Sequence, residues 1–481
     1  MKMNSCTMLR RAAITVFSLI FVWTGAMSLD LPVKKVKGVE YYYYKVKNKE
    51  TVYGVSKRLG LSRDEIVRYN PSAADGLKKN MMLYFPVADF PGEGTSVADE
   101  PEVQTDTLAA DSITVPQKSG SVAIMLPFDL DSQEKSRQGK LSVDFYKGVL
   151  IAADTLANRP GNVEIKAFDT KGDIETVKKL LATDPFIAKA SVIIAPEDEN
   201  TLKAIADSAA IRGNYVLTLM NVRDSAYLTN PFVIQANIPQ LAMYTLAADA
   251  IDEDFQGYTP VILRNISGRN EKEPFTAYLK KRFQDKGINP VEIEYDGSLT
   301  ASALNSLPVN AGEKYVVIPS SGTLAEFNKI AYVLKNWKDK VLATETSTDT
   351  PDVAVFGYPD WTAFRGDALD MLQRLEVTVY SRFFDDFEGF DARNIDSDFR
   401  RWYGSPMIES VPSQALLGFD AASCIIKNLR ANEGTFNPSY PTVYQGIQSV
   451  FKFERSGEGF VNTSLYIIKY RPDGRIQSRT I

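Results

Sequence analysis

An apolar segment, a helical repeat and a second strand-like segment constrain the fold most. Residues 122–126 are unbroken apolar and end at Pro127. A strand that is apolar on both faces is typical of a parallel sheet covered by helices on both sides. Residues 163–168 form a second predicted strand, closed by the polar residues 169–173. Between these strands, apolar residues recur at helical spacing and make one packing face: Leu141, Phe145, Gly148, Val149, Ala152 and Leu156.

This order predicts a βαβ unit, and open α/β sheets bind ligands at the carboxyl ends of such strands. The alternation continues almost to the end of the 481 residues. Strands are predicted at 191–195, 215–219, 232–235, 260–264, 291–295, 315–318 and 341–344, and helices at 201–212, 240–251, 275–286 and 324–336. The alternating residues 448–470, about Gly457 and Gly459, predict a closing hairpin.

The opening segment resembles a known family. An apolar strand ending in Leu126-Pro127, then residues 145–154 and 168–173, resemble the start of type I periplasmic binding proteins of the leucine/isoleucine/valine-binding kind. Members serve ABC transporters as substrate-binding proteins. The resemblance covers residues 121–481 and implies an α/β fold with two doubly wound parallel-sheet lobes joined by three crossings.

The family layout also implies lobe boundaries. The first crossing is expected near Asn237, residues 377–380 resemble the strand before the second, and residues 417–420 resemble a helix start late in the first lobe. The binding domain spans residues 119–481. Its first lobe is expected at about 121–237 and 383–445, and its second at about 238–382 and 446–481.

The ligand of this family lies between the lobes, against loops that follow strands. The matching loops here are residues 196–200, 220–223 and 319–323. The carboxylates of the first loop would repel a ligand carboxylate, which disfavours a free amino acid and leaves a cationic or sugar ligand open. Alternatively, the first and third loops only cap the helices that follow them. The resemblance implies the cleft residues Glu197, Asp198, Asn200, Asn221, Ser320, Ser321 and Thr323.

Residues 40–86 predict a separate small module. Tyr42, Tyr44 and Val46 alternate as a strand, Thr51 can cap a helix, Ser62 begins a second helix, and residues 81–85 form a closing strand. This βααβ order resembles a LysM domain over residues 40–87, which implies binding of N-acetylglucosamine-containing glycans such as peptidoglycan. Lys49-Glu50 and Lys79-Asn80 depart from the usual Gly-Asp and Gly-Gln. The candidate glycan contacts are Glu50, Thr51, Val52, Asn80 and Met81; alternatively, Thr51 only caps and Val52 only packs.

The remaining segments indicate export. Residues 1–28 combine Lys2, Arg10 and Arg11 with an apolar core and small residues near Ser28, which predicts a cleaved signal peptide; an uncleaved anchor is the alternative. Residues 88–118 have the composition of a flexible linker. The expected location is the periplasm or cell envelope.

Composition excludes several chemistries. The chain has no histidine, which removes Ser-His-Asp and Cys-His catalysis and His-containing metal sites. A net charge of −5 argues against nucleic acid. Cys424 lies in an apolar run and is predicted to be a buried small hydrophobe. The acidic residues 385–391 lack the spacing of a calcium loop. We therefore expect no metal, no cofactor and no enzymatic activity.

Together these features predict an exported, peptidoglycan-associated solute-binding protein of the amino-acid ABC-transporter type. Its expected partners are a peptidoglycan glycan, a small ligand (an amino acid, a peptide or a wall fragment), and an ABC permease or a wall enzyme. The alternative is a non-transport cell-wall scaffold, or a regulator of peptidoglycan enzymes, that uses the bilobed fold as a protein-docking module. Fold alone does not choose between them.

Overall fold

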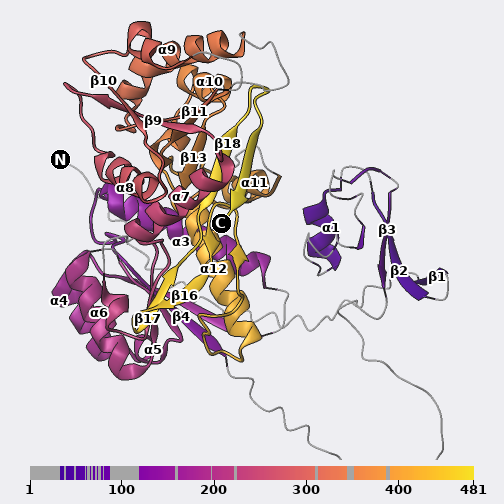
Figure 1. Ribbon diagram of the computed structural model, residues 1–481. Coiled ribbons are helices and arrows are strands. Elements are labelled where there is room, and N and C mark those ends of the chain that lie inside the picture. Colours follow the sequence, from indigo (N-terminus) through magenta and orange to yellow (C-terminus); the bar gives the residue numbers. More distant parts are fainter. Residues whose placement is uncertain are drawn as a thin grey trace, which may run out of the picture. The chain divides into compact units, whose positions relative to one another are not determined.

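The computed structural model (Figure 1) describes residues 33–36, 39–47, 50–59, 61, 66, 69–70, 73, 77–79, 81–86, 119–157, 161–196, 198–220, 225–308, 313–343, 352–385 and 390–481. The chain divides into two units, Met1–Thr105 and Asp106–Ile481. The predicted signal peptide and linker lie outside the described residues. Within the described part, no helix combines the length and apolarity that crossing a membrane requires.

The small unit is an antiparallel sheet with a helix. Its strands β1 (Val33–Val36), β2 (Val39–Lys45) and β3 (Met82–Pro86) pair in the order β1-β2-β3, and α1 (Val52–Leu59) follows β2. The helix α1 buries Val52, Val55 and Leu59, and the strand β3 buries Leu83 and Phe85. The predicted strands and first helix are confirmed, whereas β1 is additional. The predicted second helix lies mostly outside the described residues.

The first lobe of the large unit is built on a seven-stranded sheet with the order β16-β17-β8-β7-β6-β4-β5. Only β16 runs antiparallel to its neighbour among these strands. The strands are β4 (Gly120–Leu126), β5 (Val163–Asp169), β6 (Val192–Ile194), β7 (Tyr215–Thr218), β8 (Val233–Gln235), β16 (Phe453–Ser456) and β17 (Gly459–Asn462).

Helices bury both faces of this sheet, as the apolar run of β4 predicts. Val122 and Ile124 pack with α3 (Arg137–Thr155) and α12 (Gln414–Ala431) on one face. Ala123 and Met125 pack with α4 (Ile174–Thr183), α5 (Pro185–Lys189) and α6 (Glu199–Arg212) on the other. Cys424 of α12 is buried and free, as predicted. A further helix of this lobe is α11 (Phe390–Tyr403).

Helices α3 and α12 touch backbone to backbone. A Cβ atom at Gly148 would lie 1.8 Å from the carbonyl oxygen of Ala415, and one at Gly418 would lie 2.0 Å from that of Phe145. No side chain fits at either position, so these two glycines set the distance between the helices. Residues 417–420 were expected to resemble a helix start, but they lie within α12, which begins at Gln414.

The second lobe has a sheet of the same size, ordered β10-β9-β11-β12-β13-β18-β19. Its last two strands are antiparallel to their neighbours and the others are parallel. The strands are β9 (Thr259–Asn265), β10 (Val291–Tyr295), β11 (Lys314–Pro319), β12 (Asp352–Gly357), β13 (Thr378–Ser381), β18 (Tyr466–Tyr470) and β19 (Ile476–Thr480). The helices are α7 (Gln240–Asp254), α8 (Glu273–Asp285), α9 (Leu324–Leu342) and α10 (Asp367–Arg374).

One predicted strand of this lobe is wrong. Residues 341–344 were expected to be a strand, but Val341 and Leu342 end α9. The buried residues Leu334, Trp337 and Val341 continue the helical spacing, so the helix keeps its apolar face to that point. The strand is β12 instead, which begins at Asp352.

The chain crosses between the lobes three times. It passes from β8 to α7 at Asn237, as predicted, from β13 toward α11 after Ser381, and from β17 to β18 after Asn462. The last crossing is later than the predicted boundary at residue 445, because β17 pairs with β8 and Phe460 is buried in the core of the first lobe. Of the predicted hairpin 448–470, the part about Gly457 is confirmed as β16–β17, whereas β18 pairs with β13 in the second sheet. Strand order and crossings thus confirm the predicted two-lobed α/β fold.

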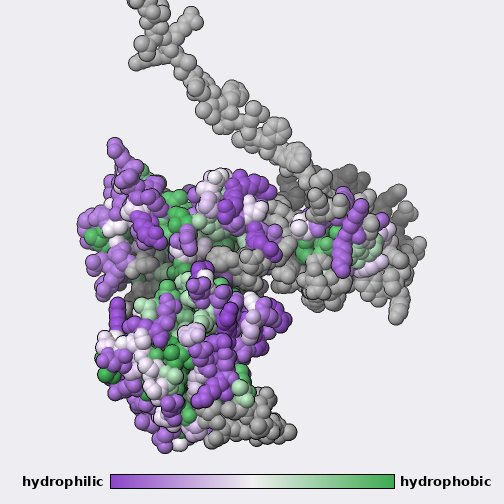
Figure 2. All heavy atoms as spheres, turned by 90° about the horizontal axis from the view of Figure 1, so that it is seen from above, coloured by the Kyte–Doolittle hydropathy of each residue, from purple (hydrophilic) through white to green (hydrophobic). Residues whose placement is uncertain are grey.

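The surface mixes polar and apolar side chains. Figure 2 shows hydrophobic residues interspersed among hydrophilic ones on the visible face. Among the exposed large apolar side chains, Ile211 is 87% exposed and Val411 is 63% exposed. Ile211 lies on α6, whereas Val411 lies beside the cavities described next.

Candidate ligand-binding site

Two adjoining cavities lie where strands of both sheets end. Cavity A, of about 900 Å³, is bordered by residues that follow β4, β6 and β7, including Pro127, Pro196 and Met220. Cavity B, of about 620 Å³, is bordered by residues that follow β9, β12 and β13 and by the first crossing at Asn237. Met220 and Val411 line both cavities, so A and B adjoin at these two residues. We treat them together as the candidate site.

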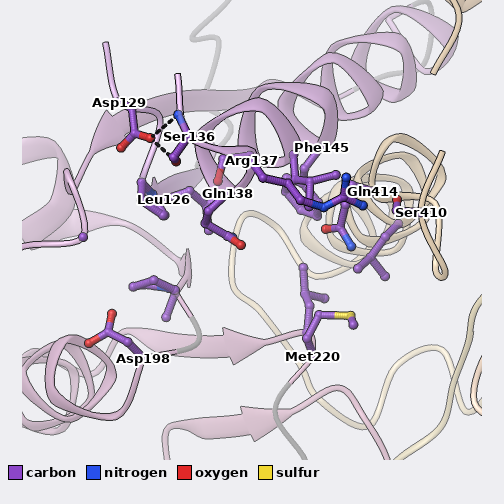
Figure 3. Close-up of a pocket in the computed structure, with 18 of the residues that line it drawn as sticks. Leu126, Asp129, Ser136, Arg137, Gln138, Phe145, Asp198, Met220, Ser410 and Gln414 are labelled. Atoms are coloured by element: carbon purple, nitrogen blue, oxygen red, sulfur yellow. Dashed lines mark hydrogen bonds between the residues drawn. The ribbon is translucent and has the colours of Figure 1, made fainter. Parts of the chain in front are cut away.

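Cavity A has an apolar lining and a polar border (Figure 3). Apolar side chains that contribute to the lining are Leu126, Leu141, Phe145, Leu219 and Leu417. Figure 3 shows Gln138, from the start of α3, and Met220, from the opposite side, facing the same space. Asp129 accepts hydrogen bonds from the backbone N–H and hydroxyl of Ser136, and Ser136 caps α3 by accepting from Gly139 N at 2.9 Å. The carboxylate and hydroxyl at this border therefore already have partners.

The loops beside cavity A are held by Asp169. Its carboxylate accepts backbone hydrogen bonds from Phe128 at 2.9 Å, Leu130 at 2.8 Å and Lys171 at 2.9 Å. Burial opposes ionisation, yet these donors outweigh it and lower the pKa of Asp169. The predicted polar turn at 169–173 thus fixes the loop that follows β4 and borders the cavity.

Cavity B contains four charged side chains, and three of them are paired. Glu271 accepts a hydrogen bond from Ser321 Oγ at 2.9 Å and another from Gly322 N at 2.6 Å. Lys272 Nζ lies 2.5 Å from the carboxylate of Asp360. Arg382 differs, since its Nε is buried without a hydrogen-bond partner.

The structure brings only part of the predicted cleft set to these cavities. Asp198 borders cavity A and caps α6 by accepting from Thr201 N at 3.0 Å. Asn200 is exposed in the first turn of α6 and is not among the described residues that line either cavity. Glu197 and Asn221 lie outside the described residues.

The two serines after β11 are buried and do not line the cavities. Ser320 and Ser321 are only 3% and 2% exposed, and neither is among the described residues lining A or B. Thr323 caps α9 by accepting from Glu326 N at 3.2 Å. Asp198 and Thr323 thus cap the helices that follow them, as the alternative predicts, and Asp198 also borders cavity A. Ser321 is instead occupied by Glu271.

Sequence reasoning missed the residues that dominate cavity B. These are Tyr244, Glu271, Lys272, Asp360, Tyr380 and Arg382. One signal was available: Arg382 comes two residues after the predicted crossing strand 377–380, which places it in the connection between the lobes. Glu271 and Lys272 follow β9 by several residues, and nothing in their local sequence distinguishes them from other exposed charges.

The predicted glycan contacts of the small unit are also engaged internally. Glu50 accepts hydrogen bonds from Tyr44 Oη at 2.7 Å, from Lys47 N at 2.6 Å and from Arg58. Burial favours the neutral form of Glu50, but the hydrogen-bond donors outweigh this effect and lower the pKa of Glu50. Thr51 caps α1, accepting from Gly54 N at 3.0 Å, and Val52 is buried, so both have the structural roles that the alternative predicts. Met81 is half-buried, and Asn80 lies outside the described residues.

Comparison with known proteins finds similar structures but no similar sequences. The sequence matches no known family model and no curated protein. An ABC transporter substrate-binding protein from Desulfitobacterium hafniense, in complex with Leu, has 13% identity and a TM-score of 0.41, covering 75% of this chain and 100% of its own. A putative branched-chain amino acid ABC transporter protein from Rhodospirillum rubrum has 13% identity and a TM-score of 0.49, with coverage of 75% and 100%.

A third structure, with a different kind of ligand, is a solute-binding protein of an ABC transporter from Rhodopseudomonas palustris BisB5 in complex with 3,4-dihydroxybenzoic acid. It has 13% identity and a TM-score of 0.43, and covers 76% of this chain and 96% of its own. These proteins are solute-binding proteins rather than enzymes. At such identities the likeness concerns the fold alone.

Proposed function

We propose that the large unit binds a small solute in the adjoining cavities A and B. The observation that carries this proposal is that Met220 and Val411 line both cavities, which lie at strand ends of both sheets and beside the crossings. A ligand there contacts both lobes, so it stabilises whichever arrangement of the lobes gives it more contacts. This is the behaviour of a solute-binding protein, in which binding is coupled to a change between the lobes.

The cellular setting belongs to the same proposal. Residues 1–28 direct export, the small unit attaches to peptidoglycan glycan, and the large unit serves as the substrate-binding protein of an ABC permease. The first two elements rest on the resemblances in the sequence, and the third on the two-lobed fold. Two of the named similar structures hold leucine and 3,4-dihydroxybenzoic acid, and these ligands guide only the choice of compounds to try first.

Ligand-induced stabilisation tests the central claim. At about 100 times its dissociation constant, a ligand stabilises the folded state by roughly 2.7 kcal/mol, which is a few degrees of melting temperature in a domain of this size. Amino acids, organic acids, amines, sugars and muropeptides are screened against the full chain. The variant Met220→Trp, which fills the junction of the cavities, is expected to abolish the shift. Ile211→Trp, on the exposed face of α6, is the control and is expected to retain it.

Glycan attachment is tested separately. The full chain is expected to sediment with insoluble peptidoglycan, and a chain lacking residues 1–105 is expected to stay in solution. Equal sedimentation of both would assign the attachment to the large unit. Failure of both would remove the glycan role, in line with the internal pairing of Glu50.

The second candidate function is a protein-docking module for cell-wall enzymes. Its specific support is that Glu271 occupies the Ser321 and Gly322 donors at the end of β11, so this loop needs no ligand to satisfy them. The test adds the purified protein to a peptidoglycan hydrolase acting on labelled sacculi. A changed hydrolysis rate, together with no ligand-induced stabilisation, would favour docking over solute binding.

A further inference from the structure

Arg382 stands apart from the other charges of cavity B. Glu271 is held by Ser321 and Gly322, and Lys272 and Asp360 form an ion pair with each other. For Arg382, by contrast, no hydrogen bond or ion pair to any described residue is present, and its Nε is a buried donor without a partner. Buried donors and buried charges in folded proteins are almost always paired, because leaving them unpaired is costly.

The surroundings of Arg382 explain its state. It lies at the second crossing, directly after β13, and lines cavity B with Tyr380 and Phe383. Burial lowers the pKa of the Arg382 guanidinium, against the opposing influence of Tyr380, Tyr244 and Asp360. A guanidinium keeps its charge even so. Arg382 is therefore a half-buried positive charge at cavity B that forms no hydrogen bond or ion pair with a described residue.

We propose that Arg382 is the anchor for the carboxylate of an organic acid bound in cavity B. A guanidinium presents parallel N–H donors that match a carboxylate, and such pairs are strong where water is excluded. This inference rests on the proposed function and specifies the ligand class of that same site.

The rest of the cavity defines the remainder of the ligand. The lining combines apolar residues with uncharged polar ones. The apolar residues include Met220, Met243, Pro359, Ala363, Val411 and Pro412, and the polar ones include Asn237, Gln240, Thr362 and Ser381. The two carboxylates that line cavity B, Glu271 and Asp360, are already paired, so neither is open to a ligand ammonium. Cavity B therefore suits a monocarboxylic acid without an ammonium group better than a zwitterionic amino acid. The acidic residue Asp198 lies in cavity A, away from this carboxylate site.

Three matched probes separate these chemistries: 4-methylpentanoate, its neutral amide 4-methylpentanamide, and leucine, which adds an ammonium. Benzoate and benzamide form a second acid–amide pair. Calorimetric titration of the full chain is expected to show acids binding, with each amide weaker by about 30-fold or more, the usual effect of losing one partner of a buried charge pair. Leucine is expected to bind more weakly than 4-methylpentanoate.

Variants test the residue itself. Arg382→Gln is expected to weaken acid binding by about 30-fold or more, and Arg382→Lys to weaken it less. Arg374→Gln removes the same charge from the exposed end of α10 and is the control, with unchanged affinity. Without ligand, Arg382→Gln is expected to raise the melting temperature slightly, because it removes a half-buried charge whose buried Nε has no hydrogen-bond partner.

The outcomes separate the two proposals. If some ligand binds the cavity but amides or amines bind as well as acids, or Arg382→Gln leaves acid affinity unchanged, the inference is overturned and solute binding stands. If no ligand class binds, the proposed function fails. The melting temperature without ligand then still tests the inference. A lower melting temperature for Arg382→Gln than for the wild type would show that Arg382 stabilises the fold, which would overturn its role as a ligand anchor.

Discussion

The ends of two strands in the second lobe, β11 and β13, carry polar side chains into the same region with opposite results. At the end of β11, Ser321 and Gly322 donate to Glu271, so these donors are satisfied within the chain. At the end of β13, Arg382 has a buried Nε with no partner. The difference shows that a polar loop after a strand indicates a ligand only when its hydrogen-bonding groups have no partner within the chain.

Asp420 shows the opposite case to Arg382, because this buried carboxyl group has several hydrogen-bond donors around it. This residue of α12 is completely buried and accepts backbone hydrogen bonds from Ile447 at 2.7 Å, Gln448 at 3.0 Å and Ser449 at 2.9 Å. Burial raises the pKa of Asp420 to about 6, although these donors oppose the shift. Even three donors thus do not offset complete burial.

This pKa predicts the largest effect. Between about pH 4 and pH 6 the folded protein binds this proton while the unfolded chain releases it, so the free energy of unfolding falls as the pH rises. The contribution of Asp420 to this fall is about 3 kcal/mol, and it levels off above pH 6. Urea unfolding of the wild type and of Asp420→Asn across this range measures it.

The difference between the two pH profiles isolates Asp420 from the other carboxylates. Asp207→Asn, on the exposed side of α6, serves as the control and is expected to leave the profile unchanged. Parallel profiles for the wild type and Asp420→Asn would show that Asp420 titrates normally.

The next effect concerns the satisfied strand end. Glu271→Ala removes the acceptor for Ser321 Oγ and Gly322 N, and it is expected to lower the free energy of unfolding by about 2 kcal/mol, as for hydrogen bonds to a charged group. Glu271→Gln keeps an acceptor oxygen and is expected to recover part of the loss. If Glu271→Ala is as stable as the wild type, the two strand ends do not differ as described.

A further readout of Glu271→Ala distinguishes a structural pairing from a ligand-like one. Added acetate can restore the missing carboxylate between Ser321 and Gly322. We expect acetate to raise the melting temperature of Glu271→Ala more than that of Glu271→Gln. Equal shifts in both variants would mean that the vacated donors do not bind an anion.

Sequence reasoning recovered the architecture because burial leaves a pattern in the residues. The apolar run of β4 predicted helices on both faces, and Val122 and Ala123 do pack with different helices. It misjudged the end of α9, since residues 341–344 suit a helix and a strand equally well until Trp337 and Val341 are seen on one buried face. Short apolar segments have this ambiguity in general.

The site was harder to predict, for a physical reason. Whether Ser321 faces a ligand depends on Glu271, which lies 50 residues earlier in the chain. The sequence shows donors and acceptors but not which of them meet. Arg382 was overlooked for the same reason, because its significance is the absence of a described partner, and no local pattern encodes an absence.

The smallest predicted effect lies between the two strand ends, at the ion pair of Lys272 and Asp360. Their side chains are 20% and 53% exposed, so water screens the 2.5 Å contact. A double-mutant cycle with Lys272→Met and Asp360→Asn is expected to give a coupling free energy of about 0.5 kcal/mol, reduced further at high salt. The same cycle bears on the ligand site. Asp360→Asn removes a negative charge of cavity B that interacts electrostatically with Arg382, so it is expected to strengthen acid binding slightly. If Asp360→Asn weakens acid binding instead, Asp360 positions the ligand, and the pairing of charges in cavity B differs from the one described.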